Sequence, residues 1–305
     1  MIPEFKSIFD LIKAFPDEQS CITHLENLRW NGNVTSPFDE TSKVYKCAGN
    51  KYKCKNTGKY FNVRTNTIFD NSKIPLQKWF LAIYVFSSHK KGISSHQLAK
   101  DISVTQKSAW FLLHRLRYAF EHPNFKDTLS NTVEIDETFV GGEAKNKHSN
   151  KKERNERGGT IHTKKPVLGM RERDGNVIAQ VVENRNKETI IPIIYNTVEA
   201  DSIIMTDEYS AYKDLSFDYT HLTVNHGAKE YVNQMAHTNG IENFWSHLKR
   251  GIDGIYHWVS KEHLQSYIDE FTLRFNTRTF GTQERFDMVL SGVSGKRLTY
   301  QNLIK

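Results

Sequence analysis

Hydrophobic residues recur at two different spacings, and this divides the first part of the chain into helical and β-rich stretches. Residues 1–30 have apolar positions at helical spacing, and Pro16 opens a second helix within that stretch. Residues 32–74 show short apolar stretches between turn residues, which indicates a small β region too short to form a core alone. Helical spacing then returns. The pattern predicts an N-terminal region over 1–74 and a second helical region over 75–125.

Two short helices in region 75–125 have the spacing of a helix-turn-helix. A serine of Ser94–Ser95 can cap the first helix, and Thr105 can cap the second across a tight turn. The second helix would present Gln106 and Lys107 at its N-terminal end, where such modules contact the major groove of DNA. An ordinary helical hairpin is the alternative interpretation.

Residues 131–276 alternate between strand and helix patterns. The candidate strands are 132–140, 166–173, 176–183 and 202–207, and the candidate helices are 187–198, 240–250 and 261–276. Asp174-Gly175 marks a hairpin between the second and third strands. Three antiparallel strands, a crossover helix and a parallel strand follow the order of an RNase H-like fold. We therefore expect an α/β core with a mixed five-stranded sheet and flanking helices. The tail, 277–305, is expected to pack on the outside or to touch DNA.

The overall charge points to a polyanionic partner. The 305 residues carry a net charge of +7 with a pI near 9.1, which favours a nucleic-acid backbone, although a merely basic soluble protein is the alternative. Basic residues are concentrated within 143–173. We predict that DNA contacts are made by Lys151, Lys152, Arg154, Lys164, Lys165 and, on a later helix, Arg250.

Composition also limits the class of protein. A hydrophobic content of 38% with 12% aromatic residues is typical of a folded protein. No apolar stretch approaches the roughly 18 residues of a membrane span, and the first residues lack a signal-peptide pattern. The three cysteines cannot all pair, which suits a reducing compartment. We expect a cytoplasmic protein.

Three acidic residues are placed where a metal-dependent nuclease needs them. Asp136 lies in the first candidate strand and Asp207 ends the fourth, which should be its neighbour at the centre of the sheet, while Glu242 begins a helix. Such carboxylates can hold two divalent ions for phosphoryl transfer, and their oxygens suit Mg²⁺ or Mn²⁺. Lys249 follows Glu242 by seven positions on the same helix face, where it can contact phosphate. Taken alone, each acid is more simply explained as a solvated strand end, and it is the combination of the three with Lys249 that favours a functional site.

Neighbouring residues compete for a role in this site. Strand alternation places Glu134 on the same face as Asp136 and Glu137 on the opposite face. His226 and His237 could orient a phosphate, but a surface or packing role is the simpler interpretation. Trp245 is interpreted as a core residue of its helix.

At these residues the chain resembles transposases of the IS1595 (ISXO2-like) insertion-sequence family, within the DDE superfamily. The motifs that carry the resemblance are Ile74-Pro-Leu-Gln-Lys-Trp-Phe, Lys91-Gly-Ile-Ser-Ser, Thr105-Gln-Lys-Ser-Ala-Trp, Val133-Glu-Ile-Asp-Glu-Thr-Phe-Val-Gly-Gly, Thr206-Asp-Glu-Tyr-Ser-Ala-Tyr, His237-Thr-Asn-Gly-Ile-Glu-Asn-Phe-Trp-Ser-His-Leu-Lys-Arg and Lys296-Arg-Leu-Thr-Tyr. The resemblance implies that Asp136, Asp207 and Glu242 are the catalytic metal ligands and Lys249 the accompanying basic residue, with Asn239 as a weaker alternative to Glu242. It further implies binding to terminal repeats and target DNA, at least a dimer, and a bacterial protein associated with the nucleoid.

One departure from the family concerns zinc. The family usually carries an N-terminal zinc ribbon with two Cys-x-x-Cys pairs, whereas Asn33–Glu40 here contains no cysteine and the second pair retains only Cys54. A structural zinc site needs four nitrogen or sulfur ligands, so we expect no zinc. The ribbon is instead expected to keep its shape through the packing of Tyr45, Tyr52, Tyr60 and Phe61.

Three functions are compatible with these observations. The first is a transposase that cuts the ends of its element and joins them to target DNA. The second is a catalytically silent DNA-binding protein derived from such a transposase, which the degenerate ribbon favours and the intact acids disfavour. The third, a nuclease without strand transfer, is disfavoured because the N-terminal half also matches the family.

Overall fold

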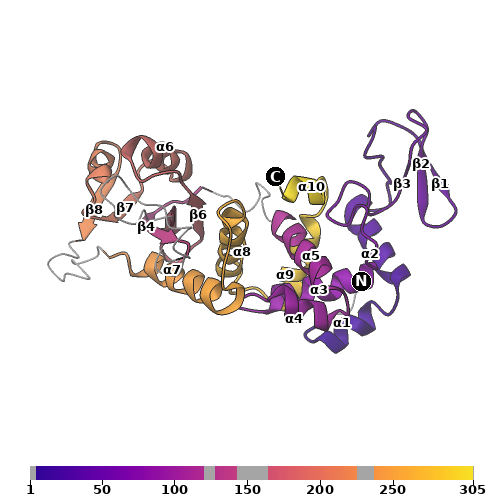
Figure 1. Ribbon diagram of the computed structural model, residues 1–305. Coiled ribbons are helices and arrows are strands. Elements are labelled where there is room, and N and C mark those ends of the chain that lie inside the picture. The colour runs from indigo at the N-terminus through magenta and orange to yellow at the C-terminus, as the bar shows by residue number, and fades with distance from the viewer. Residues whose placement is uncertain (1–4, 120–127, 143–163, 225–236, 305) are drawn as a thin grey trace. The chain divides into compact units, whose positions relative to one another are not determined.

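The computed structural model describes residues 5–119, 128–142, 164–224 and 237–304, and the chain divides into two compact units (Figure 1). The N-terminal unit comprises Met1–His122 and Thr279–Lys305, and the α/β unit comprises Pro123–Arg278. In the described part of the chain, no helix has both the length and the apolar character needed to cross a membrane.

Helices from both ends of the sequence build the core of the N-terminal unit. They are α1 (Ile8–Ala14), α2 (Glu18–Trp30), α3 (Leu76–Ser88), α4 (Ser95–Asp101), α5 (Gln106–Ala119), α9 (Thr282–Ser291) and α10 (Tyr300–Leu303). Phe286 of α9 is fully buried, and its ring packs edge-on against Phe5 and Phe80, with centroids 5.1 and 5.5 Å apart. The expectation that residues 277–305 pack on the outside is therefore wrong for α9, because its apolar face is part of the core.

The helix pair α4 and α5 forms as predicted, with its caps in place. Ser94 accepts a hydrogen bond from the backbone N–H of Gln97 at 3.2 Å and so caps α4. The Thr105 hydroxyl accepts a hydrogen bond from the backbone N–H of Ser108 at 3.2 Å at the start of α5. Between the helices, Ser103 adopts a left-handed backbone with φ 51°, which closes the tight turn.

The predicted β region is a small antiparallel sheet of β1 (Val44–Cys47), β2 (Lys51–Cys54) and β3 (Tyr60–Phe61). Tyr52 pairs with Phe61 across the sheet, and their stacked rings, 5.7 Å apart, are both buried. Tyr45 and Tyr60 are 43% and 59% exposed, so the expectation that all four aromatic residues pack together is wrong for these two. Their positions alternate with the buried pair, and strand geometry turns them to the other face.

The loops of this ribbon bring together two pairs of residues at the spacing of zinc ligands, but the residues present do not suit zinc. In one loop the backbones of Ser36 and Asp39 pair in an isolated β-bridge. At the other loop, between β2 and β3, lie Cys54 and Thr57. The buried Cys54 sulfur lies beside the hydroxyl groups of Ser36, Ser42 and Thr57. One thiol surrounded by neutral hydroxyls lacks the four nitrogen or sulfur ligands of a structural site.

We expect the purified protein to contain no stoichiometric zinc and to melt at the same temperature with and without a chelator. The triple substitution Ser36→Cys, Asp39→Cys and Thr57→Cys should create a four-thiolate site with Cys54 and bind zinc, because the backbone already presents both pairs at that spacing. Metal analysis and thermal melting measure both results. A wild-type protein that loses bound zinc and stability together on chelation would contradict this.

The α/β unit is built on one five-stranded sheet whose strand order is β6-β5-β4-β7-β8. The strands are β4 (Thr132–Val140), β5 (Lys165–Glu172), β6 (Val177–Val181), β7 (Ile203–Asp207) and β8 (Thr220–Val224). β4, β5 and β6 are antiparallel, whereas β7 runs parallel to β4 and β8 parallel to β7. The predicted mixed sheet is thus confirmed, with the first and fourth strands adjacent. The hairpin at Asp174-Gly175 is confirmed as well, with Asp174 at φ 62°.

Helices cover both faces of this sheet (Figure 1). On one face lie α6 (Lys187–Thr197) and the 3₁₀ helix η4 (Ser210–Phe217), which share an apolar core with Ile135 and Leu168. On the other face lie α7 (Asn239–Gly251), the π-helical turn η6 (Ile252–Tyr256) and α8 (Leu264–Asn276), which pack on Val167 and Val177. The strands thus alternate between two apolar layers, and polar side chains that lie in either layer need specific partners.

Candidate active site

The two central strands place Asp136 beside Asp207. In the parallel ladder, Thr132 pairs with Ile203 and Glu134 with Met205. Two further steps of the same register bring Asp136 opposite Asp207, on strands spaced roughly 4.8 Å apart. The predicted neighbourhood of these two acids on the sheet is therefore present. Asp207 is the last residue of β7 and accepts a hydrogen bond from the backbone N–H of Tyr209 at 3.0 Å. This bond fixes its carboxylate at the C-terminal end of the strand.

Trp245 of α7 connects the helix to the sheet at Asp136. Its indole N–H donates a hydrogen bond to Asp136 Oδ2 at 3.0 Å, and the ring is buried. Gly169 pairs with Asp136 on the neighbouring strand β5, and a Cβ there would lie 2.4 Å from Trp245 Cζ2. The indole can reach Asp136 only because Gly169 has no side chain. The interpretation of Trp245 as a core residue is confirmed, but its hydrogen bond to Asp136 was not predicted.

We expect Gly169→Ala to reduce the free energy of unfolding by about 1–3 kcal/mol, because the added methyl group displaces a packed indole. Gly142→Ala is the matched control, since a Cβ at Gly142 meets nothing within 4 Å. Urea unfolding followed by tryptophan fluorescence measures the difference. If Gly169→Ala and Gly142→Ala were equally stable, the close approach of the indole would be refuted.

Glu242 enters the site from the first turn of α7. Thr238 donates a hydrogen bond to Glu242 Oε1 at 3.0 Å. Four polar side chains of α7 are exposed, namely Asn239, Glu242, Lys249 and Arg250. Arg250 also donates a hydrogen bond to the Ser246 hydroxyl at 2.7 Å. The helix therefore offers its acidic and basic side chains to solvent while its apolar face, with Trp245, lies on the sheet.

The start of α7 is fixed to the sheet by a buried carboxylate, Glu134. Glu134 is 1% exposed and accepts a hydrogen bond from the backbone N–H of Ile241 at 2.9 Å. Arg173 Nη2 and His237 Nδ1 lie 3.4 and 3.3 Å from its other oxygen. A negative charge at a helix N-terminus also interacts favourably with the positive end of the helix dipole. The prediction that Glu134 lies on the same face of the sheet as Asp136 is confirmed. His237 packs against Glu134 in this cluster. The sequence analysis missed the anchoring role of Glu134, because the amino-acid sequence alone does not reveal which backbone N–H donates a hydrogen bond to its carboxylate.

Glu137 faces the opposite side of the sheet, as strand alternation predicts. It accepts a hydrogen bond from the hydroxyl of the buried Tyr212 in η4. The pKa of Glu137 is raised to about 7, mainly by burial and also by Asp207 and Asp136, against the lowering effect of Tyr212 and Arg185. An additional carboxyl group thus lies within electrostatic range of the two aspartates.

The electrostatics of Asp136 suit a bound cation. The pKa of Asp136 is raised to about 6, mainly by burial and to a smaller extent by the Asp207 and Glu242 carboxylates, whereas the hydrogen bond from Trp245 lowers it. Carboxylates that repel one another are stabilised by a divalent ion, and their oxygens are ligands of Mg²⁺ and Mn²⁺. Among the described residues, no three acidic, histidine or cysteine side chains are gathered closely enough to form a ready-made metal site.

The predicted DNA-contacting residues fall in three described places and one segment outside the described residues. Arg250 is exposed on α7. Lys164 and Lys165 are half-buried where β5 begins, and Lys165 pairs with Val140. Gln106 and Lys107 lie at the start of α5 in the N-terminal unit. The remaining predicted contacts Lys151, Lys152 and Arg154, together with His226, lie outside the described residues.

Comparison with known proteins places the chain among transposases. Residues 128–276 match the ISXO2-like transposase domain. A protein in the transposable element ISH50 of Halobacterium salinarum is 29% identical over 276 residues, covering 86% of this chain and 92% of that protein. A transposase-like protein of Haemophilus influenzae is 34% identical over 108 residues, covering 35% of this chain and 86% of that protein.

Two solved structures also match, at low similarity. They are a pre-cleavage Mos1 transpososome, covering 72% of this chain and 79% of that chain, and a Mos1 transposase paired-end complex with the left transposon end, covering 70% and 79%. Each is 12% identical with a TM-score of 0.30. The family assignment rests on the sequence matches, and they confirm the predicted resemblance. The chain belongs to the ISXO2-like transposase family.

Proposed function

We propose that this protein is a DDE transposase that binds the terminal repeats of its own insertion sequence, cuts at the ends and joins them to target DNA. One observation carries the proposal: Asp136 and Asp207 lie side by side on the adjacent central strands β4 and β7, and Glu242 is close enough to raise the pKa of Asp136. The strand order β6-β5-β4-β7-β8, with helices on both faces, supports an RNase H-like core for this reaction.

In this proposal Asp136, Asp207 and Glu242 hold divalent ions, Mg²⁺ or Mn²⁺, through their carboxylate oxygens. Ions held there would supply activation of the attacking water or hydroxyl and stabilisation of the leaving oxygen of the phosphodiester. Trp245 holds the Asp136 carboxylate in one orientation through its hydrogen bond. Lys249, exposed on α7, contacts the phosphate backbone beside the acids. Asn239 is exposed at the start of the same helix and is the weaker alternative to Glu242 as a ligand.

DNA recognition is assigned to both units. The pair α4 and α5 acts as a helix-turn-helix, with Gln106 and Lys107 in the major groove. The basic residues Lys164, Lys165 and Arg250, with Lys151, Lys152 and Arg154, hold flanking or target DNA through its phosphates. Such contacts make binding strongly salt-dependent. Bringing two ends together requires at least a dimer, and the protein would act in the bacterial cytoplasm, on the nucleoid.

The test uses labelled DNA that carries one end of the element encoding this chain. Wild-type protein with Mg²⁺ should produce cleaved ends and products joined to a target plasmid, whereas Asp207→Asn should bind the same DNA without cutting it. Glu208→Gln, an exposed acid next to Asp207, is the matched control and should cut normally. Cleavage that persists in Asp207→Asn would refute the site assignment.

The same experiment separates the alternative functions. Binding by the wild-type protein with no metal-dependent cleavage would favour a catalytically silent DNA-binding protein. Cleavage without joined products would favour a nuclease. The absence of any binding to the element ends would overturn the transposase proposal itself.

A further inference from the structure

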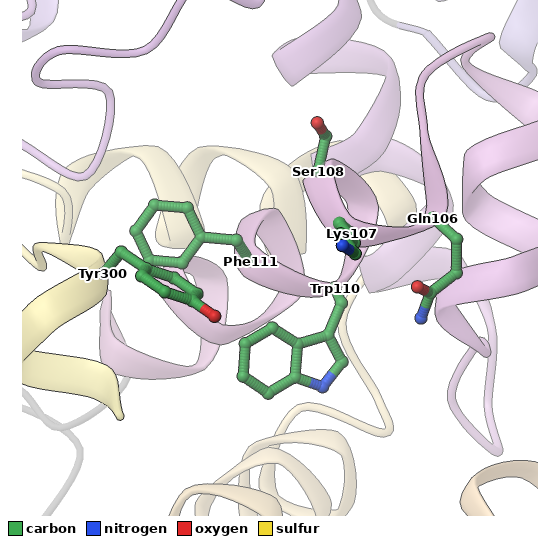
Figure 2. A pocket seen from close by; sticks show the side chains of 6 residues that line it. All are labelled: Gln106, Lys107, Ser108, Trp110, Phe111 and Tyr300. Carbon is green, nitrogen blue, oxygen red and sulfur yellow. The ribbon is translucent and has the colours of Figure 1, made fainter. Parts of the chain in front are cut away.

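An aromatic notch lies in the N-terminal unit beside the first turns of α5 (Figure 2). It has a volume of about 480 Å³ and is lined by Gln106, Lys107, Ser108, Trp110, Phe111 and Tyr300. Figure 2 shows the ring of Tyr300 against that of Phe111, with Trp110 beside them and Gln106 beyond Trp110. We call this feature the aromatic notch. It combines residues of α5 with a residue of α10 almost two hundred positions later in the chain.

The rings of the aromatic notch are held in place but are not covered. Tyr300 packs edge-on against Phe111, with centroids 5.7 Å apart, yet it remains 56% exposed. The Arg115 guanidinium lies 4.4 Å from the centre of the Phe111 ring and donates a hydrogen bond to the Ile68 carbonyl at 2.8 Å. Trp110 is half-buried. Single exposed apolar residues are ordinary on a protein surface, but three adjacent rings at one opening indicate a contact surface.

The surroundings of the aromatic notch fit DNA. Gln106, Lys107, Trp110 and Phe111 are positions 1, 2, 5 and 6 of α5, so they share one side of the helix. Lys107 is exposed at the rim, and Gln106 is fixed by donating a hydrogen bond to Ser95 at 2.8 Å. Residues 90–118 contain four exposed lysines, Lys90, Lys91, Lys100 and Lys107, and a single acidic residue, Asp101. This charge complements a phosphate backbone.

We propose that the aromatic notch reads thymine by contact with its C5-methyl group in the major groove of double-stranded DNA. This rests on the proposed function, in which α5 enters that groove. The thymine methyl is the apolar group that base pairs display there, and ring carbons can bury it without losing a hydrogen bond. Lys107 contacts phosphate beside it, and Gln106 offers an amide to a base edge. Tyr300 makes the C-terminal segment part of the sequence-reading surface.

The test measures binding of the full chain to a fluorescent duplex carrying one end of its element, with each thymine replaced in turn by deoxyuridine, which lacks only the methyl group. For the wild-type protein, at least one replacement should weaken binding about fourfold, the effect of one buried methyl group. Trp110→Ala and Tyr300→Ala should bind the thymine and deoxyuridine duplexes equally well. Phe9→Ala removes a 66% exposed ring on α1 and should keep the wild-type ratio. Thermal melting establishes that each variant is folded.

Three outcomes would overturn the inference in distinguishable ways. If the wild-type protein binds the end duplex but no deoxyuridine replacement matters, the aromatic notch does not read thymine, while the proposed function stands. The same conclusion follows if Trp110→Ala weakens binding but keeps the wild-type ratio between the two duplexes, because the ring then has only a structural role. If the wild-type protein prefers the end duplex no more than an unrelated duplex of equal length, the proposed function fails and the inference fails with it.

Discussion

Replacing Asp136 by asparagine should abolish DNA cleavage and, at the same time, stabilise the metal-free protein above pH 6. The pKa of Asp136 is raised from 3.8 to about 6, mainly by burial and further by Asp207 and Glu242. The folded protein therefore holds this proton more tightly than the unfolded chain, and ionisation above pH 6 costs stability that Asp136→Asn recovers. Two pKa units correspond to at most about 3 kcal/mol in the free energy of unfolding. An asparagine oxygen can still accept the hydrogen bond from Trp245.

The pH dependence of this gain is its distinguishing feature. Below the unfolded pKa both states are protonated and the penalty vanishes, so the gain should fall to roughly half at pH 5 and be complete at pH 8. Urea unfolding in the presence of a chelator measures it. Added Mg²⁺ should then stabilise the wild-type protein but not Asp136→Asn, because ligand binding stabilises only the state that binds. Asp253→Asn, an exposed acid on η6, should change neither quantity. A variant that is less stable than the wild-type protein at pH 8 would contradict the argument.

The order of elements in the α/β unit could be predicted because each strand there shows its own apolar pattern. The strand that contains Asp136 and the strand that ends at Asp207 were recognisable by alternation and by length, and chain order then made them neighbours. Helix α9 was missed because Gly281, Arg285 and Ser291 give its segment the composition of a loop. Its three buried apolar residues, Phe286, Val289 and Leu290, become informative only once their partners in α3 and α2 are known, and those contacts join the two ends of the sequence.

The candidate site shows the same limit at the level of side chains. Sequence spacing placed three acids in one region, and strand alternation assigned Glu134 and Glu137 to opposite faces. Nothing in that alternation distinguishes a metal ligand from a helix anchor, since both require a carboxylate at the sheet centre. The distinction depends on whether a backbone N–H or an open space meets the oxygens. That is a tertiary property, set here by the position of α7 above β4.

Glu134 should accordingly be among the most sensitive positions in the α/β unit. Glu134→Ala removes the carboxylate from the N–H of Ile241 and from Arg173 and His237 while these groups stay at least partly buried. The loss of one partner of a buried ion pair costs about 3–5 kcal/mol in the free energy of unfolding. Glu134→Gln can still accept the hydrogen bond from Ile241, so its cost should be smaller, about 1.5–3 kcal/mol, as for a hydrogen bond to a charged group.

The activity of these two variants tests whether Glu134 positions α7 rather than binding metal. Because Glu134→Gln keeps the anchor of α7, the end-cleavage assay should retain activity at a temperature where the variant is folded, whereas Asp136→Asn is inactive at every temperature. Glu134→Ala should lose both stability and cleavage, since Glu242 is displaced together with the start of the helix. Gly240 constrains the same place, because a Cβ there would lie 2.5 Å from Glu134 Oε2. If Glu134→Gln were as stable as the wild-type protein yet inactive, Glu134 would instead be a fourth ligand of the metal site.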